Sequence, residues 1–319
     1  MTYTSHTKQD RMTDMLPELI IPAGTQVVTR AEIRDAGGRI IRPRGAVGII
    51  VALPVDAQHA YRVRFADGGE DAPRRGELSI RKEYQRDGLL PDSTLDERDL
   101  AQYIIYRCVI GSRAYGLDDD ASDTDRRGIY LPPADRHWSL AGVPEQLEDD
   151  GTRDTYWELQ KFLVLALKAN PNVLECLSTP LVEHATPLAQ ELRAMQTAFV
   201  SKLIYQTYNG YVLSQFKKLE QDLRTKGAIK QKHAMHLIRL LLAGATALRE
   251  GVIPVRITEH RERLLAIKRG ELPWDDVNAW RLELHQAFDA AFAATRLPER
   301  PDYDRVNALL LRARRSMVR

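Results

Sequence analysis

Two acidic residues separated by one position, Asp123 and Asp125, follow shortly after a Gly-Ser pair at Gly111 and Ser112. If the acids begin a β-strand, their side chains project from the same face, because side chains alternate along a strand. Two carboxylates held that close repel each other unless a cation lies between them. Mg²⁺ prefers oxygen ligands and is commonly bound by one or two carboxylates together with substrate phosphates. The pair is therefore a candidate metal site; the competing interpretation is a solvated acidic turn.

The Gly-Ser pair follows an apolar, β-rich run, IIYRCVI, and is expected to form the turn at its end. Glycine permits close approach of the backbone, and such a turn offers N–H groups and a hydroxyl to a phosphate. Arg113 adds a charge suited to phosphate or to the neighbouring acids. We expect one segment to bind a triphosphate and the other to hold the metal that bridges it. The acids between the two motifs, Asp118 to Asp120, are interpreted as loop residues.

A third carboxylate would complete a two-metal site of the kind that catalyses phosphoryl displacement. Three acids further along the chain are candidates: Asp154, Glu158 and Asp150. Asp154 is the first choice because it precedes a β-rich triplet. Glu158 could instead begin the helix KFLVLALKA, since an acid suits the N-terminal end of a helix dipole. The choice among the three stays open.

Three further residues in KQKHAMHLIRLL could bind the same ligand. Lys232, His236 and Arg239 are spaced i, i+4 and i+7, so they share one helix face. A stripe of Lys, His and Arg suits a triphosphate. The alternative is a solvated basic face. We expect His233 to be peripheral and no His-based metal site to form.

The elements that must position these residues fall into three zones. Residues 17–85 contain short β-rich runs separated by Gly and Pro, which indicates a small β-barrel, after a flexible tail at 1–16. Residues 86–185 mix strand and helix, and residues 186–319 show helical apolar spacing almost throughout. We predict an α+β protein: a mixed sheet with helices, a C-terminal helical bundle and an N-terminal small β-barrel.

The first zone resembles SH3-like barrels of the ribosomal-protein and transcription-factor type in its pattern, which implies binding of nucleic acid or protein. In HAYRVRF, Tyr61, Val63 and Phe65 alternate with arginines. Interleaved arginines and aromatic residues suit contact with an RNA backbone, although a plain basic surface is the alternative. The candidate contacts are Arg42, Arg44, Arg62 and Arg64.

The composition of the chain excludes several classes of protein. A net charge of +2 over 319 residues is no global polyanion signature, so a nucleic-acid surface would be a local patch. Cys108 and Cys176 lie far apart in apolar contexts and are interpreted as buried free thiols. No apolar run reaches the roughly 18–20 residues that cross a membrane. The polar N-terminus lacks the apolar core of a secretory signal, so we expect a cytoplasmic location.

The spacing Gly-Ser, ten residues, Asp-x-Asp resembles the signature of the DNA polymerase β superfamily of nucleotidyltransferases. The longer form GSRAYGL…SDTDRRGIYLPP resembles the branch associated with RNA repair and RNA ligation operons. KFLVLALKANPNVLECL, KQKHAMHLIRLL, LREG and AIKRGEL follow in the same order. The resemblance covers roughly residues 100–319, so the first zone looks like an added domain. It implies a polymerase β-like core, two Mg²⁺ or Mn²⁺ ions on Asp123, Asp125 and the third carboxylate, and a nucleotide cleft bordered by the basic helix.

The implied activity is metal-dependent transfer of NMP from a nucleoside triphosphate to a hydroxyl. The association with RNA repair favours an RNA 3′ end, such as that of a tRNA, as the acceptor. One alternative is nucleotidylation of a protein or small molecule, as in toxin-like or antibiotic-modifying relatives. The other is a non-catalytic RNA-binding scaffold, against which the intact Asp-x-Asp argues.

Overall fold

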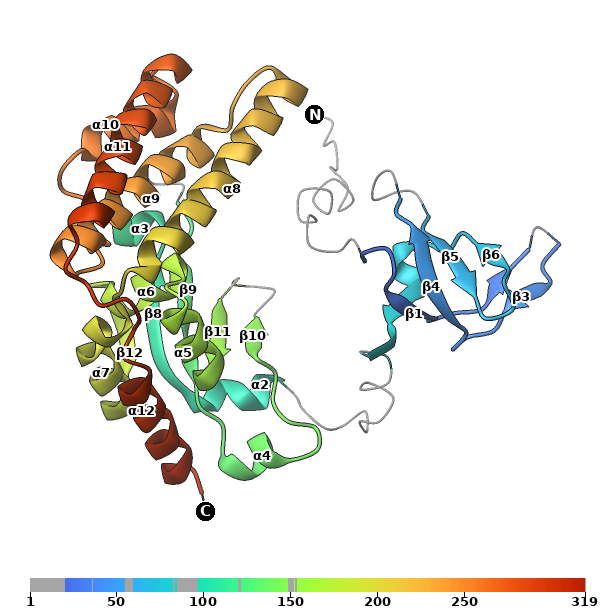
Figure 1. Ribbon diagram of the computed structural model, residues 1–319. Helices are drawn as coiled ribbons and strands as arrows, with labels where there is room; N and C mark the ends of the chain where they lie inside the picture. Colours follow the sequence, from blue (N-terminus) through green and yellow to red (C-terminus); the bar gives the residue numbers. More distant parts are fainter. Residues whose placement is uncertain are drawn as a thin grey trace, which may run out of the picture. The chain divides into compact units, whose positions relative to one another are not determined.

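The chain forms two compact units, Met1–Thr94 and Leu95–Arg319, drawn in Figure 1. The computed structural model describes residues 21–35, 37–54, 60–82, 84, 97–119, 122–148, 152 and 154–318. The expected tail at 1–16 lies outside these residues.

The first unit is an antiparallel sheet of five short strands in the order β6-β5-β4-β1-β7. Its core includes Tyr61, Val63 and Phe65, while Arg62 and Arg64 are exposed, so the predicted alternation in this run is confirmed. Closure of the sheet into a barrel stays a prediction. The strands are β1 (Gln26–Thr29), β4 (Val47–Ala52), β5 (Arg62–Phe65), β6 (Glu70–Asp71) and β7 (Leu78–Ile80), with a separate ribbon of β2 (Ile33–Arg34) and β3 (Ile40–Arg42).

The second unit is built on a mixed sheet in the order β10-β11-β9-β8-β12. Strand β9 runs antiparallel to β8 and parallel to β11, which makes the sheet mixed, as predicted. The strands are β8 (Ile104–Ile110), β9 (Asp125–Tyr130), β10 (Gln146–Glu148), β11 (Thr155–Glu158) and β12 (Val182–Ala185). Together with the helices below, this arrangement confirms the α+β class.

Helices cover the sheet and extend beyond one end of it, where α8, α9, α10 and α11 gather in Figure 1. Helix α9 is central, because it packs against α8, α10 and α11. None of the helices in the described part of the chain has the length and apolar character needed to cross a membrane. The helices are α2 (Glu97–Leu100), α3 (Ser112–Tyr115), α4 (Ala134–Trp138), α5 (Leu159–Leu167), α6 (Pro171–Ser178), α7 (Pro187–Ala194), α8 (Leu203–Lys226), α9 (Gln231–Glu250), α10 (Arg261–Arg269), α11 (Trp274–Ala294) and α12 (Tyr303–Ser316).

Local sequence signals fix several helix ends. Asn170 caps α6 by accepting backbone N–H bonds from Asn172 and Val173, and Pro171 occupies the first turn, where its missing N–H costs nothing. Helix α9 ends at Gly251, whose positive φ of 70° is the left-handed conformation that glycine adopts without a steric penalty.

The two faces of the mixed sheet carry different cores. Cys108, Ile110 and Ile129 lie in the large core shared with the helices, whereas Tyr130 and Tyr156 belong to a small cluster on the opposite face. Both cysteines, at 108 and 176, are buried and free, as predicted. The pairing of Ile110 with Asp125 places the Asp-x-Asp motif at the end of the strands, on the face that the helices cover.

Candidate active site

A pocket of about 320 Å³ lies where the end of β8 and the start of β9 meet helices α9 and α10. It brings together the predicted Gly-Ser turn, both acids of the Asp-x-Asp motif, and two of the three basic-stripe residues. Its walls are Gly111, Ser112, Asp119, Ser122, Asp123, Asp125, Lys232, Met235, His236 and Lys268. The lining includes both carboxylates and amines, which suits a ligand that carries both a metal ion and phosphates.

Gly111 makes the closest approach to the acidic pair. Its φ is 75°, and a Cβ built on it would lie 2.7 Å from Oδ2 of Asp125. Any other residue would therefore meet a strained backbone and would also push the Asp125 carboxylate away. Glycine at this position is what allows strand β8 to end beside the first residue of β9.

We expect Gly111→Ala to displace the Asp125 carboxylate and to lower the free energy of unfolding by about 1 kcal/mol through its left-handed backbone. Gly142→Ala is the matched control, because Gly142 has a φ of 64° and nothing within 4 Å of a built Cβ. Nucleotidyl transfer and thermal unfolding are measured for both variants. Equal losses of transfer in the two variants would show that the close approach to Asp125 has no role.

The structure does not bring Asp154 or Glu158 into the pocket. Thr155 on β11 pairs with Arg127 on β9, so Asp154 lies on the sheet face opposite Asp125. Its Oδ2 accepts a hydrogen bond from the Tyr156 hydroxyl at 3.2 Å, and its Oδ1 is buried with no hydrogen-bond partner. Glu158 caps α5, as the helix-dipole alternative expected, and pairs with Arg314 at 2.5 Å. Asp150, the third candidate, lies outside the described residues.

Arg113 and Arg239 also take places other than the pocket wall. The Arg113 guanidinium donates to the backbone carbonyl of Ser122 at 2.8 Å, so it braces the loop that precedes the acidic pair. Arg239 is only 5% exposed and forms an ion pair with Glu175, which is fully buried. Lys232, His236 and Arg239 do lie on one helix with the predicted spacing. Because α9 runs from the pocket into the core, the third of them, Arg239, is buried.

A buried polar cluster of Tyr115, Glu175 and Arg239 joins the elements that carry the pocket. The Tyr115 hydroxyl donates to Oε2 of Glu175 at 2.6 Å, and the Arg239 guanidinium lies 3.9 Å from the centre of the Tyr115 ring. Burial raises the pKa of Tyr115 far above its usual value, so the hydroxyl stays a donor. Because these residues come from α3, α6 and α9, the cluster fixes the Gly-Ser turn against the helix that bears Lys232 and His236.

His236 is held neutral at the pocket wall. Burial, reinforced by the charges of Arg239 and Lys232, lowers its pKa to about 3. Its ring stands edge-on to the ring of Tyr115, with 6.4 Å between the centroids. A neutral imidazole still offers one N–H to a phosphate oxygen, so His236 can bind a ligand without carrying charge.

The low pKa of His236 predicts a pH dependence of stability. Unfolding restores an ordinary histidine pKa near 6.5, so below that pH the unfolded chain takes up a proton that the folded chain does not. The contribution of neutral His236 to the free energy of unfolding is therefore complete above about pH 6.5 and is lost as the pH falls toward 3. The loss is at most ~1.4 kcal/mol per pH unit, and it is smaller than this limit because His236 is only half-buried.

Urea unfolding at pH 7, 6 and 5 tests this dependence. We expect the wild-type protein to lose more stability over that range than His236→Gln, which keeps a hydrogen-bonding side chain but cannot titrate. Identical pH profiles for the two proteins would show that His236 titrates normally in the folded state.

Lys268 and Asp119 line the pocket although sequence reasoning did not select them. The Lys268 ammonium donates to the carbonyl of Leu117 at 2.9 Å and to Oδ2 of Asp119 at 2.7 Å. Lys268 lies in the block AIKRGEL, which carried the family resemblance, and that was the available signal. Asp119 lies in the loop, as predicted, and it also lines the pocket, where its carboxylate pairs with Lys268.

The pocket also contains oxygen donors suited to a metal ion. Mg²⁺ is typically bound by one or two carboxylates with waters and substrate phosphates, and Asp123 and Asp125 supply that donor set. Within the described ranges, no group of three or more His, Cys, Asp or Glu side chains is arranged to hold an ion by itself. The protein donors therefore fit an ion that is completed by a nucleotide's phosphates, and they fall short of an all-protein cage.

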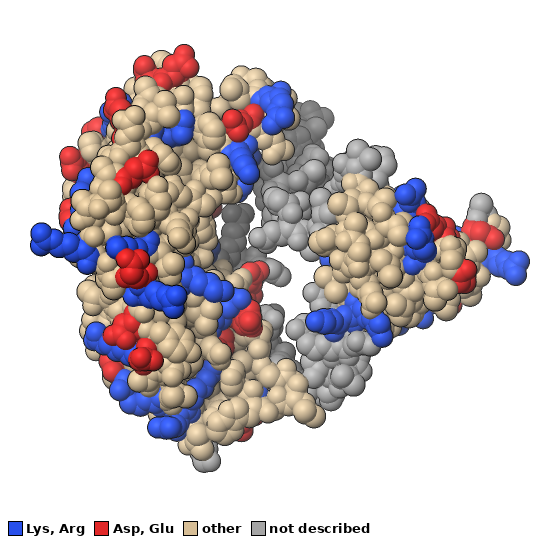
Figure 2. Space-filling model, viewed as in Figure 1, with Lys and Arg blue, Asp and Glu red and all other residues tan. Residues whose placement is uncertain are grey.

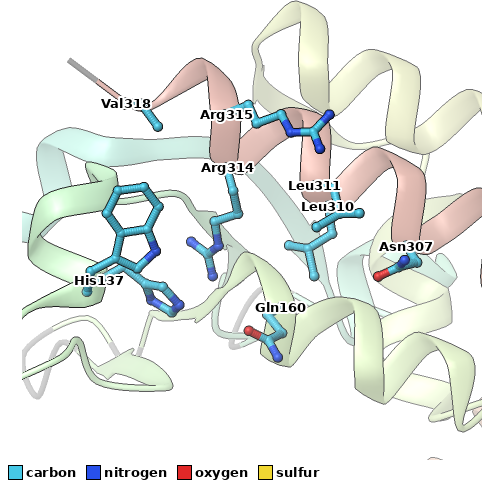
Figure 3. Close-up of a pocket in the computed structure, with 9 residues that line it drawn as sticks. His137, Gln160, Asn307, Leu310, Leu311, Arg314, Arg315 and Val318 are labelled. Carbon is cyan, nitrogen blue, oxygen red and sulfur yellow. The ribbon is translucent and has the colours of Figure 1, made fainter.

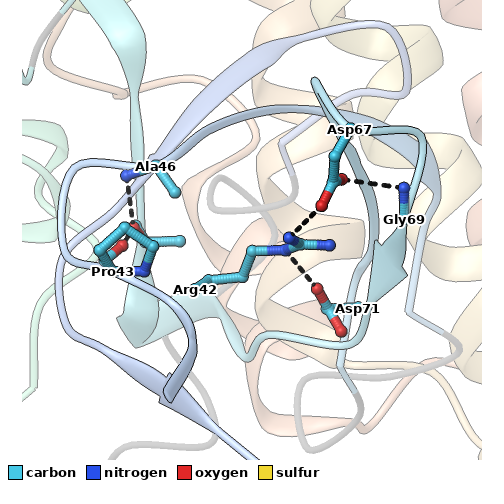
Figure 4. A network of polar contacts seen from close by, with 7 residues as sticks. Arg42, Pro43, Ala46, Asp67, Gly69 and Asp71 are labelled. Atoms are coloured by element: carbon cyan, nitrogen blue, oxygen red, sulfur yellow. Dashed lines mark hydrogen bonds and ion pairs between the residues drawn. The ribbon is translucent and has the colours of Figure 1, made fainter.

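In the N-terminal unit, the predicted nucleic-acid contacts are engaged to different degrees. Figure 4 shows Arg42 held by Asp67 at 2.5 Å and Asp71 at 2.6 Å, and its guanidinium lies 4.6 Å from the centre of the Phe65 ring. Arg42 therefore stabilises the sheet. Arg64 and Arg62, both on the exposed side of β5, share one acidic partner, Glu70. The Arg64 guanidinium lies 2.7 Å from the Glu70 carboxylate, and the Arg62 guanidinium lies 3.4 Å from it. Arg44 is exposed and belongs to neither of these pairs.

A mixed sheet that carries a Gly-Ser turn beside an Asp-x-Asp pair, with a helix bearing Lys and His across the pocket, is the arrangement expected of a nucleotidyltransferase. Residues 93–312 match the model of a family described as RNA repair pathway DNA polymerase beta family, RlaP. The chain belongs to this family, which implies a nucleotidyltransferase role linked to RNA repair.

A protein of known sequence is similar to part of this chain. The "Uncharacterized protein YcgL" of Bacillus subtilis (strain 168) is 30% identical over 163 residues. The match covers 50% of this chain and 61% of that protein, so the similarity spans less than two thirds of the relative.

Proposed function

We propose that the protein transfers a nucleoside monophosphate from a nucleoside triphosphate to the 3′ hydroxyl of an RNA. The observation that carries the proposal is the pocket itself. It combines a Gly-Ser turn, the paired carboxylates Asp123 and Asp125, and two lysines that come from different helices. Membership of an RNA repair family supports RNA as the acceptor.

The residues divide into those that bind phosphates and those that hold metal. Lys232, exposed at the start of α9, and Lys268, across the pocket on α10, attract the negatively charged triphosphate. Ser112 and the neutral His236 offer hydrogen bonds that orient it. Asp123 and Asp125 would hold Mg²⁺ or Mn²⁺ together with the phosphates, and the ion would supply neutralisation of their charge.

The reaction is an in-line displacement at the α-phosphorus. The oxygen of the acceptor hydroxyl bonds to the α-phosphorus and gives up its proton to solvent. The bond from the α-phosphorus to the oxygen that bridges it to the β-phosphate breaks, and pyrophosphate leaves with that oxygen. The chain contributes positioning and fixed charge. A second ion would need a third carboxylate. Within the part of the chain that the structure describes, Asp119 is the further acid on the pocket wall, and Lys268 already engages it, so the resting arrangement supports one ion.

For the N-terminal unit we propose an SH3-like barrel that contacts the RNA backbone. The exposed Arg44, with Arg62 and Arg64 on the open side of β5, supports this role, while Arg42 is committed to its acidic partners. Glu70 offsets part of the charge of Arg62 and Arg64. Among alanine substitutions of the four candidate arginines, Arg44→Ala is therefore expected to weaken RNA binding most.

Incubation with each of the four α-labelled nucleoside triphosphates, with and without total RNA, tests the function. Label on RNA supports the proposal and identifies the base. Label on protein would instead indicate nucleotidylation of a protein, and label on neither would indicate a non-catalytic RNA-binding scaffold.

A further inference from the structure

A second pocket of about 460 Å³ lies in the same unit between α4, the start of α5 and α12. It shares no lining residue with the candidate active site. Strand β9 starts at the active-site end with Asp125, and α4 follows the other end of that strand, so the two pockets lie toward opposite ends of a strand that is about 17 Å long at a rise of ~3.3 Å per residue. The lining residues are His137, Trp138, Gln160, Asn307, Leu310, Leu311, Arg314, Arg315 and Val318.

The pocket presents an unusual apolar surface to solvent. Trp138 is 65% exposed, and Leu311 and Val318 are about half exposed. The exposed face of the indole is a large apolar surface in contact with water, which is unfavourable in free energy. A planar ligand stacked on that face would remove it from water. The volume is within the range of pockets that hold small organic ligands.

Polar groups at the pocket wall have unused bonding capacity. Arg314 binds Glu158 through Nη2, but its Nη1 is buried without a hydrogen-bond partner, and so is Nδ1 of His137. Figure 3 shows the Arg314 side chain reaching from α12 toward His137 and Gln160. Both atoms belong to side chains that line the pocket, and buried polar atoms without partners are costly, so a polar ligand edge that drew either side chain outward would relieve that cost.

The charged side chains that line the pocket, among the described residues, are Arg314, which is paired with Glu158, and Arg315. Burial and the neighbouring Arg314 lower the pKa of His137, so the imidazole is uncharged at neutral pH. Arg315 adds a second guanidinium at the exposed rim. Figure 2 shows lysine and arginine atoms gathered over the end of this unit where α12 lies. An anionic ligand is therefore favoured.

The ligand chemistry that satisfies all these features is a nucleotide. A base stacks on an indole or on an apolar wall, the amides of Gln160 and Asn307 can donate to and accept from its edge, and a guanidinium binds its phosphate. Single-stranded nucleic acid is commonly bound by this combination of aromatic platform and basic groove.

We infer that this pocket, here called the Trp138 pocket, binds an unpaired nucleotide of the RNA acceptor upstream of its reacting 3′ end. The assignment of the bound nucleotide to the RNA acceptor rests on the proposed function. Because the pocket is separate from the active site, the nucleotide bound there is not the one that reacts. An RNA strand is favoured over a free nucleotide because Trp138 lies open at the rim and Arg315 continues the basic surface beyond the pocket.

Fluorescence anisotropy of a labelled, unstructured oligoribonucleotide, without nucleoside triphosphate, tests the inference. Trp138→Ala is expected to weaken binding by about 5- to 150-fold, the range that loss of one stacked base produces. Trp138→Phe keeps most of the affinity. Leu140→Ala, the removal of a fully exposed neighbour outside the pocket, changes nothing. Binding of heparin, a polyanion without bases, is unchanged by Trp138→Ala.

The outcomes separate this inference from the proposed function. Unchanged RNA affinity in Trp138→Ala would overturn the inference and would leave catalysis untouched; the groove would then suit a protein partner. AMP binding as tightly as the oligoribonucleotide would overturn the assignment to an RNA strand. Trp138-dependent binding of RNA with no label transfer by the wild-type protein would support the pocket and contradict the proposed function.

Discussion

Replacement of both Asp123 and Asp125 by asparagine is expected to abolish nucleotidyl transfer while the protein stays folded. The two carboxylates face one pocket and supply the oxygen donors for an ion shared with the nucleotide. Loss of a single preorganised electrostatic contact typically costs roughly 100- to 1,000-fold in rate, and the double variant removes the whole metal-binding group. Stability is expected to hold or rise slightly, because two like charges at a strand end are removed.

Asp118→Asn is the matched control, since Asp118 is exposed in the same loop and does not line the pocket. The rate of label transfer and the thermal unfolding midpoint are measured for both proteins. Transfer retained within tenfold in the folded double variant would contradict the assignment of the metal-binding acids.

Glu175→Gln is expected to lower the free energy of unfolding by ~3–5 kcal/mol, the largest stability effect that we predict. The substitution leaves the Arg239 guanidinium, 5% exposed, without its charged partner in the core. It also weakens the bond from the Tyr115 hydroxyl, so α3 and α9 lose the contact that aligns the pocket. Urea denaturation monitored by far-UV circular dichroism gives the change.

Two comparisons make this prediction specific to the buried pair. Glu183→Gln breaks the exposed pair with Arg126, at 34% and 35% side-chain exposure, and should cost no more than ~1 kcal/mol. The double variant Glu175→Gln with Arg239→Met removes the uncompensated charge and should recover part of the loss. A Glu175→Gln cost similar to that of Glu183→Gln would contradict the role of the cluster.

Several features of the candidate site were visible in the sequence because they depend on local spacing. The apolar run before Gly111 predicts a strand with a turn after it, and alternation places Asp123 and Asp125 on one face. The helical period of KQKHAMHLIRLL puts Lys232 and His236 together. The structure brings these segments to one pocket.

Other features depend on how the elements pack. The face on which Asp154 lies is set by the register of β11 against β9, which no local pattern encodes. Helix α9 packs against α8, α10 and α11, and this packing buries Arg239. The helical spacing alone puts Arg239 on the same face as Lys232 and does not show that it is buried. Lys268 and Asp119 pair at the pocket although 149 positions separate them in the sequence, so only the tertiary fold reveals the pair.

The position of the transferred label tests the central claim most directly. The wild-type protein is incubated with RNA and the preferred nucleoside triphosphate carrying label on either the α- or the γ-phosphate. We predict that α-label enters the RNA 3′ end, that γ-label is released in pyrophosphate, and that RNA with a blocked 3′ hydroxyl accepts neither. Transfer of γ-label to RNA would mean phosphoryl rather than nucleotidyl transfer, and together with the absence of α-label it would contradict the account.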